Sequence, residues 1–393
     1  MIDFRLTDEQ VRWQKIAREF AEKEIRPVVA ELDSREDPKD RFAWDLITKA
    51  SKLGFRTLSV PKKWGGGGAD LLTQAIVCEE LGTGDRGFAG QLGANMKNAL
   101  YLSALLDKDQ QEEFIPQYIK DDTYLIAIGT TEPDSGTDVL LPHDEPGTAM
   151  KTRAIRDGKE YVINGIKRFV SNGAVAKLYF IYARTDENKP VSKATSLFLV
   201  PNNAPGFSIG KIYDELGIRL ASRAELILDD VRVPARYLVG KENEALSAQR
   251  HLFSVSMVNT ISAAIGEARR CYEETRAYAK ERIQGGKPII EHINIGTRIA
   301  DMRIWIEAAR NLVWKVAWSY DTKYEYEPLL IPLTKAYVNE LSIKVIENAL
   351  EVYGGTGVQK RECPIERYLR NAYNMLPAGG TPTVNRIKAM QML

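Results

Sequence analysis

The feature that most constrains the fold is a change in hydrophobic period at a polar turn, residues 130–138. Before this turn, apolar residues recur at the spacing of amphipathic helices. After it come short alternating runs bounded by Gly, Pro, Asn and Asp, which are typical of strands. Helical spacing returns from about Asn243. We therefore predict a mixed α and β fold with an N-terminal α-helical domain (1–123), a middle antiparallel β-barrel domain (124–241) and a C-terminal four-helix bundle domain (242–393).

Local signals support this division. Thr7-Asp8-Glu9-Gln10 has the pattern of a capping box that opens a helix, and the Pro- and Gly-rich segment 59–68 predicts a loop. Asp157-Gly158 is a hairpin signal between two β-rich runs. Further helices are predicted at residues 43–53, 72–81, 90–106, 108–120, 245–283, 295–320, 330–353 and 365–373. An aromatic surplus in the bundle segment predicts homo-oligomerisation or a helix buried on all sides, as judged from Trp305, Trp314 and Trp318.

Composition excludes several classes of protein. The 54 Lys and Arg residues balance 53 Asp and Glu residues, so the net charge of +1 predicts neither nucleic acid nor a membrane surface as a partner. The N-terminal segment lacks the apolar core of a signal peptide, and no stretch reaches the length of a membrane span, which predicts a cytoplasmic location. Three widely spaced cysteines and three scattered histidines predict neither a disulfide framework nor a metal site.

The polar turn itself is a candidate ligand site. It concentrates hydroxyl groups and backbone N–H groups directly after the apolar run 124–129, and its Gly and Pro residues favour unusual backbone angles. Such a turn suits a flat polar heterocycle or a phosphate. An ordinary turn stabilised by Asp and Ser side chains explains the same residues, so this segment alone leaves both interpretations open.

Four motifs occur in a fixed order. Residues 131–138 read T-E-P-x-x-G-[ST]-D, and residues 164–173 read N-G-x-K-x-[FW]-[IV]-[ST]-N-G. The bundle segment carries G-G-x-G at 354–357 and G-T at 380–381. Together they resemble the acyl-CoA dehydrogenase family over nearly the whole chain, apart from extra residues near 142–148. The resemblance implies FAD as cofactor, an acyl-CoA thioester as substrate, an electron-transfer flavoprotein or similar acceptor, and a homotetramer.

The resemblance also implies the residues of the site. Thr131 would hydrogen-bond the pyrimidine end of the flavin, Ser171 would lie near its N5 atom, and Phe169 takes the stacking position that is usually Trp. Arg282 would meet the pyrophosphate across a subunit interface. The implied cofactor-binding residues are Thr131, Thr137, Phe169, Ser171, Arg282, Gln284, Glu351, Gly354, Gly355, Thr381 and Thr383. The implied substrate-binding residues are Arg86, Gln91 and Thr137.

The chain departs from the family at the catalytic base. Family members commonly have E-G-T followed by Arg, and aligning Gly380-Thr381 with Arg386 places Gly379 where the glutamate would be. A subgroup carries its base on the first long helix of the bundle, at a position that aligns with Ser256. Neither position has a carboxylate, and removal of a proton from carbon needs an acceptor within reach. Dehydrogenation by either usual glutamate is therefore not supported.

Three interpretations follow. In the leading one, an FAD enzyme oxidises an unusual acyl-CoA thioester, for example an alicyclic one, by hydride transfer to flavin N5. Its base then lies elsewhere, as in relatives that use an Asp from the N-terminal helical domain. Asp85 is the candidate for that base, with a helix N-cap as its other explanation. In the second, the same scaffold acts as a flavin oxidase, desulfinase or monooxygenase. In the third, the protein binds flavin and thioester but is catalytically silent.

Overall fold

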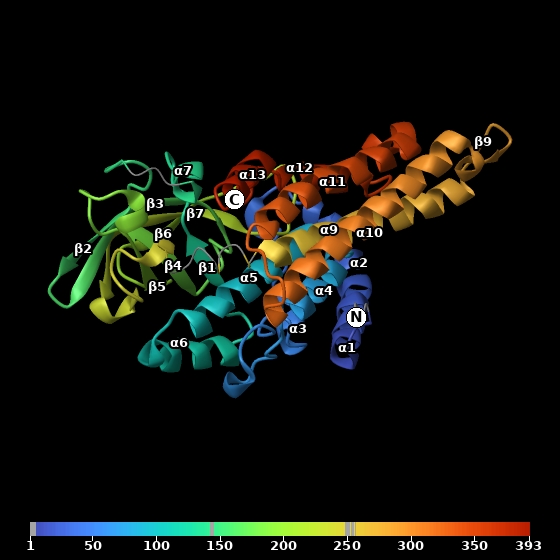
Figure 1. Ribbon diagram of the computed structural model, residues 1–393. Helices are drawn as coiled ribbons and strands as arrows, with labels where there is room; N and C mark the ends of the chain where they lie inside the picture. Colours follow the sequence, from blue (N-terminus) through green and yellow to red (C-terminus); the bar gives the residue numbers. More distant parts are fainter. Residues whose placement is uncertain (1–4, 142–144, 248–251, 253–254, 256) are drawn as a thin grey trace.

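The computed structural model describes residues 5–141, 145–247, 252, 255 and 257–393. It consists of N-terminal helices, a β domain and C-terminal helices, which are all visible in Figure 1. This is the mixed α and β class predicted from the change in hydrophobic period. Among the described residues, no helix is long and apolar enough to cross a lipid bilayer.

The N-terminal helices begin where the sequence provides caps. Thr7 and Gln10 form the predicted capping box, with the Gln10 N–H 3.2 Å from Thr7 Oγ1 and the Thr7 N–H 3.0 Å from Gln10 Oε1. The helix predicted at 90–106 begins earlier, because Asp85 accepts the Phe88 N–H and caps it. The helices here are α1 (Asp8–Phe20), the π-helical turn η1 (Ala21–Ile25), α2 (Arg26–Ser34), α3 (Trp44–Lys52), α4 (Leu71–Gly82), α5 (Arg86–Ala104) and α6 (Lys108–Lys120).

The middle of the chain forms one eight-stranded sheet with the order β6-β7-β3-β2-β4-β5-β8, and β1 pairs with β4. Its strands are β1 (Ile126–Gly129), β2 (Arg153–Asp157), β3 (Glu160–Ser171), β4 (Leu178–Arg184), β5 (Thr195–Pro201), β6 (Phe207–Ile212), β7 (Arg223–Pro234) and β8 (Leu238–Val239). Most pairs are antiparallel, as predicted, but β1 and β2 both run parallel to β4. Parallel pairing requires a crossover connection, so short-range turn signals did not reveal it. The short helix α7 (Thr137–Leu140) follows β1.

The C-terminal helices form a long group that extends away from the β domain (Figure 1). They are α9 (Met257–Glu281), α10 (Ile293–Thr322), α11 (Leu330–Tyr353), α12 (Ile365–Asn374) and α13 (Pro382–Met390). The hairpin of β9 (Ile283–Gln284) and β10 (Lys287–Pro288) lies at the outer end of this group. Gly285 and Gly286 form its two-residue turn with φ values of 61° and 80°, a conformation that favours glycine. Helix α13 extends beyond the predicted elements.

The two helical parts are joined by a close crossing of α4 and α9. At the crossing, Gly82 of α4 faces Ala263 and Gly266 of α9, and a Cβ atom on either glycine would overlap a backbone carbonyl of the other helix. Ala263 belongs to the same buried apolar cluster as the N-terminal helices, although it lies on a C-terminal helix. The crossing fixes α5, which flanks α4, relative to α9.

Gly266→Ala is expected to lower the free energy of unfolding by about 1–3 kcal/mol, because the added methyl group would overlap the Glu79 carbonyl oxygen across the crossing. The matched control is Gly90→Ala on α5, where a Cβ atom meets nothing within 4 Å. This control should be neutral or stabilise the protein by up to about 1 kcal/mol. Denaturant unfolding of both variants measures the difference, and equal stabilities would contradict a close backbone crossing.

Candidate functional site

A cavity of about 510 Å³ lies where the N-terminal helices, the β domain and the C-terminal helices meet. Its walls come from α5, from the turn after β1, from the end of β3, from the loop 215–223, from the start of α9 and from the segment 374–381. The structure brings together these residues of the sequence prediction: Arg86, Gln91, Thr131, Thr137, Phe169, Ser171, Gly379 and Thr381. Segments far apart in the sequence therefore share one site.

A buried ion pair attaches the polar turn to β3. Lys167 Nζ lies 2.6 Å from Glu132 Oε1, and both side chains are buried. Glu132 also accepts the backbone N–H groups of Lys151 at 2.6 Å and Thr152 at 3.0 Å. Burial opposes the charge of Glu132, but Lys167 and these N–H donors hold its pKa below the ordinary value. The carboxylate is thus ionised and organises the turn from within.

Phe169 is turned into the cavity by a bulge in β3. The register between β3 and β7 shifts between Lys167 and Val170, and Phe169 has a φ of 54°. A bulky residue rarely adopts this left-handed conformation, so surrounding contacts must hold it. Half of the side chain is exposed, its ring centroid lies 4.7 Å from that of Tyr213, and Arg168 lies 5.0 Å from its centroid. The ring therefore offers one face to a flat ligand.

The turn also contains local hydrogen bonds to the side chain of Asp138. Asp138 Oδ1 accepts the Gly136 N–H at 2.7 Å and lies 3.2 Å from Ser135 Oγ. The Thr131 carbonyl accepts the Arg168 N–H at 2.7 Å. Asp138 thus stabilises the backbone while Thr131 and Thr137 line the cavity. Local hydrogen bonds that stabilise the turn and hydroxyl groups that line the cavity thus occur in the same turn, on different residues.

Helix α5 supplies polar atoms without hydrogen-bond partners. Gln91 Oε1 accepts the Ser222 N–H at 2.8 Å, but its buried Nε2 has no partner. Asn98 Nδ2 donates to the Ile126 carbonyl at 2.7 Å, and its Oδ1 has none. Arg86 forms an ion pair with Glu267 at 3.5 Å, yet its Nε and Nη1 make no hydrogen bond. Buried polar groups without partners at a cavity wall indicate a polar ligand.

Asp85 lies next to this wall and does not line the cavity. Its Oδ1 accepts the Phe88 N–H at 2.7 Å, so the carboxyl group is the N-cap of α5. Burial raises its pKa. The structure thus places Asp85 in the capping role that the sequence offered as its other explanation.

Gly379 lines the cavity in a left-handed turn, with a φ of 65° that favours glycine. A Cβ atom on Gly379 would lie 2.9 Å from Met257 Sδ and 3.5 Å from Lys335 Cε. Lys335 is buried beneath this turn, and its Nζ donates to the Gly380 carbonyl at 2.7 Å. Ser256 lies outside the described residues. The backbone at residue 379 is therefore poorly suited to carry a longer side chain.

The remaining predicted residues do not line this cavity. Thr383 is exposed on α13, next to Thr381, which caps that helix. The others gather at the outer end of the long helices and are exposed: Arg282, Gln284, Glu351, Gly354 and Gly355. Tyr278 and Tyr353 connect this group by stacking at 4.1 Å between ring centroids. One chain thus presents two separate groups of predicted residues.

Several cavity residues were missed by sequence reasoning. Glu215 lies in the loop between β6 and β7, and it forms an ion pair at 2.8 Å with Arg223, the first residue of β7. Met257 lines the cavity, and Lys335 lies beneath its glycine turn. None of these four residues belongs to a motif. The pairing of Glu215 with Arg223 depends on the course of the loop between β6 and β7, which the sequence does not reveal.

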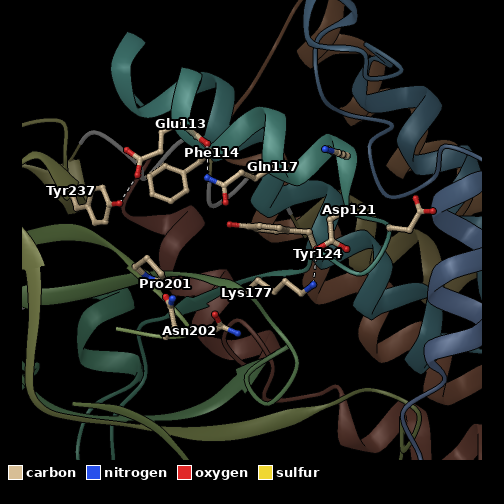
Figure 2. Close-up of a pocket in the computed structure, with 12 residues that line it drawn as sticks. Glu113, Phe114, Gln117, Asp121, Tyr124, Lys177, Pro201, Asn202 and Tyr237 are labelled. Atoms are coloured by element: carbon tan, nitrogen blue, oxygen red, sulfur yellow. Dashed lines mark hydrogen bonds and ion pairs between the residues drawn. The ribbon is translucent and has the colours of Figure 1, made fainter. Parts of the chain in front are cut away.

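A second cavity, of about 770 Å³, lies between α6 and the β domain (Figure 2). Three of its charged side chains, Asp121, Lys177 and Glu113, form ion pairs. Asp121 lies 2.5 Å from Lys177, and Glu113 accepts the Tyr237 hydroxyl at 2.5 Å and pairs with Arg236. None of the residues predicted from the sequence lines it. Volume alone therefore does not identify the functional site.

Comparison with known proteins agrees with this architecture. Three family models match the chain: the acyl-CoA dehydrogenase N-terminal domain at residues 7–122, the middle domain at 127–231 and the C-terminal domain at 246–393. The cyclohex-1-ene-1-carbonyl-CoA dehydrogenase of Syntrophus aciditrophicus is 34% identical over 97% of this chain and 89% of its own length.

Solved structures give the same result. Butyryl-CoA dehydrogenase of Megasphaera elsdenii has a TM-score of 0.91 and 30% identity over 99% of both chains. A chain in a structure of the electron transferring flavoprotein of Acidaminococcus fermentans has a TM-score of 0.91 and 32% identity over 99% of both chains.

Lys335→Met is expected to change how stability depends on pH. Burial, with repulsion from Lys388 and Arg86, lowers the Lys335 pKa to about 7. Between that value and the unfolded value of about 10.4, the unfolded state binds more protons. Lys335 therefore makes the free energy of unfolding rise with pH in this window, by at most about 1.4 kcal/mol per pH unit.

Denaturant unfolding at pH 7 to 10 should show a weaker rise for Lys335→Met than for the parent protein. Lys280→Met, at an exposed position near the end of α9, is the control and should keep the parent slope. Parallel pH profiles for all three proteins would contradict a buried Lys335 with a lowered pKa.

Proposed function

Because the chain belongs to the acyl-CoA dehydrogenase family, we propose that it oxidises an unusual, alicyclic acyl-CoA thioester without a base at residue 379. Members of this family are FAD-dependent oxidoreductases that act on CH–CH groups of CoA thioesters, and this chain is one of them. The observation that carries the proposal is Gly379 in a left-handed turn. A relative that is named for a cyclic substrate, cyclohex-1-ene-1-carbonyl-CoA, supports the alicyclic acyl group.

The residues of the cavity fit FAD. The exposed ring face of Phe169 suits the flat isoalloxazine, and Thr131, Thr137 and Ser171 supply hydroxyl groups around it. Donors near the pyrimidine carbonyls and N5 stabilise the negative charge of a reduced flavin. Bound FAD supplies the hydride acceptor. In this proposal the chain holds the ring between the bulge of β3 and the wall formed by α5, and excludes water from it.

The second group of residues supports a site completed by another copy of the chain. Arg282 and Gln284 are exposed beside the hairpin that projects from the molecule, with Glu351, Gly354 and Gly355 nearby. An arginine fork and an open glycine backbone suit a pyrophosphate and an adenosine. Since the same chain keeps this group away from its own cavity, we propose a homotetramer in which one protomer completes the cofactor site of its neighbour.

The substrate contacts follow from the wall of α5. Arg86 and Gln91 present N–H groups without hydrogen-bond partners, which can donate to a polar group of the thioester. Thr137, near the end of the 131–138 motif that begins with Thr131, lines the same cavity. As electron acceptor we propose an electron-transferring flavoprotein, an assignment supported by the similar chain from Acidaminococcus fermentans.

A flavin oxidase, desulfinase or monooxygenase is the second candidate, and a catalytically silent flavin and thioester-binding protein is the third. Both are favoured by the same observation, which is the glycine at residue 379. They differ from the leading proposal in whether a thioester reduces the flavin without oxygen.

Anaerobic mixing of the purified protein with straight-chain, branched and alicyclic acyl-CoA thioesters tests the proposal. We expect the flavin absorbance to bleach with an alicyclic thioester. Bleaching only by straight-chain thioesters would contradict the proposed substrate. Reaction that requires oxygen would favour the oxidase, and absence of any response would favour the silent protein.

Arg282→Ala is expected to weaken FAD binding by at least about tenfold, because a charge-assisted fork to the pyrophosphate would be lost. Arg303→Ala is the matched control, since Arg303 is also exposed on the long helices but pairs with Glu307. Flavin content of the purified proteins and FAD titration measure the effect. Equal flavin content in both variants would exclude the proposed role of Arg282.

A further inference from the structure

The cavity has one carboxylate among its described lining residues, and it is Glu215. Glu215 follows β6 in a loop that passes along the cavity before β7 begins. Its side chain is 15% exposed, and its partner Arg223 is 13% exposed. The sequence motifs gave no role to either residue.

The two oxygens of Glu215 differ. Oε1 accepts Arg223 Nη1 at 2.8 Å. Oε2 is buried and has no hydrogen-bond partner. Leaving a buried carboxylate oxygen unpaired is costly unless a ligand or water completes it. One oxygen is therefore held in place, while the other is enclosed without a partner in a residue that lines the cavity.

The loop that carries Glu215 is attached to the segment leading to Gly379. Gly217 N–H and Ile218 N–H donate to the side-chain oxygens of Asn374 and Asn371, at 3.4 Å and 2.5 Å. Arg223 Nη2 lies 3.3 Å from Met375 Sδ. Ile218 has a φ of 48°, a strained conformation for a β-branched residue. These contacts fix the carboxylate on the same side of the cavity as the turn that contains Gly379.

We infer that Glu215 is the catalytic base of this enzyme, acting from the loop between β6 and β7 in place of a carboxylate at residue 379. The inference rests on the proposed thioester oxidation. Oε2 takes a proton from an acyl carbon, and the electron pair of that C–H bond forms the new C=C bond. The neighbouring C–H bond would lose its hydride at the same time, and bound FAD, held by Thr131, Phe169 and Ser171, would supply the acceptor. The protonated Glu215 returns its proton to water once the unsaturated thioester has formed.

Arg223 has a positioning role in this arrangement. Its hydrogen bond to Oε1 fixes the orientation of the carboxylate. Asp85 offers no comparable arrangement, because the oxygen that caps α5 is directed to Phe88 and the side chain does not line the cavity. Glu215 is the better placed acceptor.

Glu215→Gln in the flavin-loaded protein tests the inference, because the amide keeps the shape but cannot accept a proton. We expect kcat for the best thioester of the panel to fall by about 10²- to 10⁴-fold, with flavin content and thioester affinity within about twofold of the parent. The matched control is Asp214→Asn, in the neighbouring residue of the same loop, which is exposed and does not line the cavity. This variant should retain the parent kcat.

A second readout separates a base from a structural ion pair. A 3-thia analogue of the preferred thioester retains the acidic C–H bond but has sulfur in place of the carbon that gives up the hydride. In D2O, the parent and Asp214→Asn should exchange this proton for deuterium, as measured by mass spectrometry, and Glu215→Gln should exchange it at least about tenfold more slowly.

Exchange by Glu215→Gln at the parent rate, or a parent kcat, would overturn the assignment of Glu215 while leaving thioester oxidation intact. A parent protein that oxidises no thioester of the panel would instead overturn the proposed function, and the base with it. A variant that loses flavin or thioester binding together with activity would show that Glu215 is structural, which also overturns the inference.

Discussion

The ion pair between Glu132 and Lys167 is the interaction on which the site depends. It joins the polar turn after β1 to β3 inside the β domain, with both charges buried. Removing one member of such a pair typically costs about 3–5 kcal/mol, because the other charge is left without a partner. The pair fixes Thr131 on one side and the bulge of Phe169 on the other. The hydroxyl groups and the ring therefore face one cavity, although they belong to separate motifs.

How much could be predicted from the sequence depended on how local each signal was. The cavity residues of the two polar motifs were predictable because each motif is short and continuous, so Thr131, Thr137, Phe169 and Ser171 arrive at the site together. The N-cap role of Asp85 was also within reach, since capping is a local interaction. The parallel pairing of β1 with β4 was not, because it depends on a crossover between distant segments.

The same reasoning explains why Glu215 was missed. Its significance comes from Arg223 across the loop and from the contacts of Gly217 and Ile218 with the end of α12, and none of these pairs is close in sequence. The alignment places Gly379, which has no side chain, at the usual position of the base. It could not indicate which other segment of the cavity lining carries an acid, because that requires the course of the loop in three dimensions.

The position of an acid on the loop between β6 and β7 has a consequence for the substrate. In a cyclic acyl group, the ring restricts how each C–H bond can be directed. A base that reaches the acyl group from a different loop then selects a different ring C–H bond, while the thioester carbonyl keeps its place against the donors of α5. The left-handed turn at Gly379 fits this view, because a Cβ atom there would lie 2.9 Å from Met257 Sδ, so the turn has little room for a carboxylate side chain. The change of base and the change of acyl group can thus be two results of one rearranged wall.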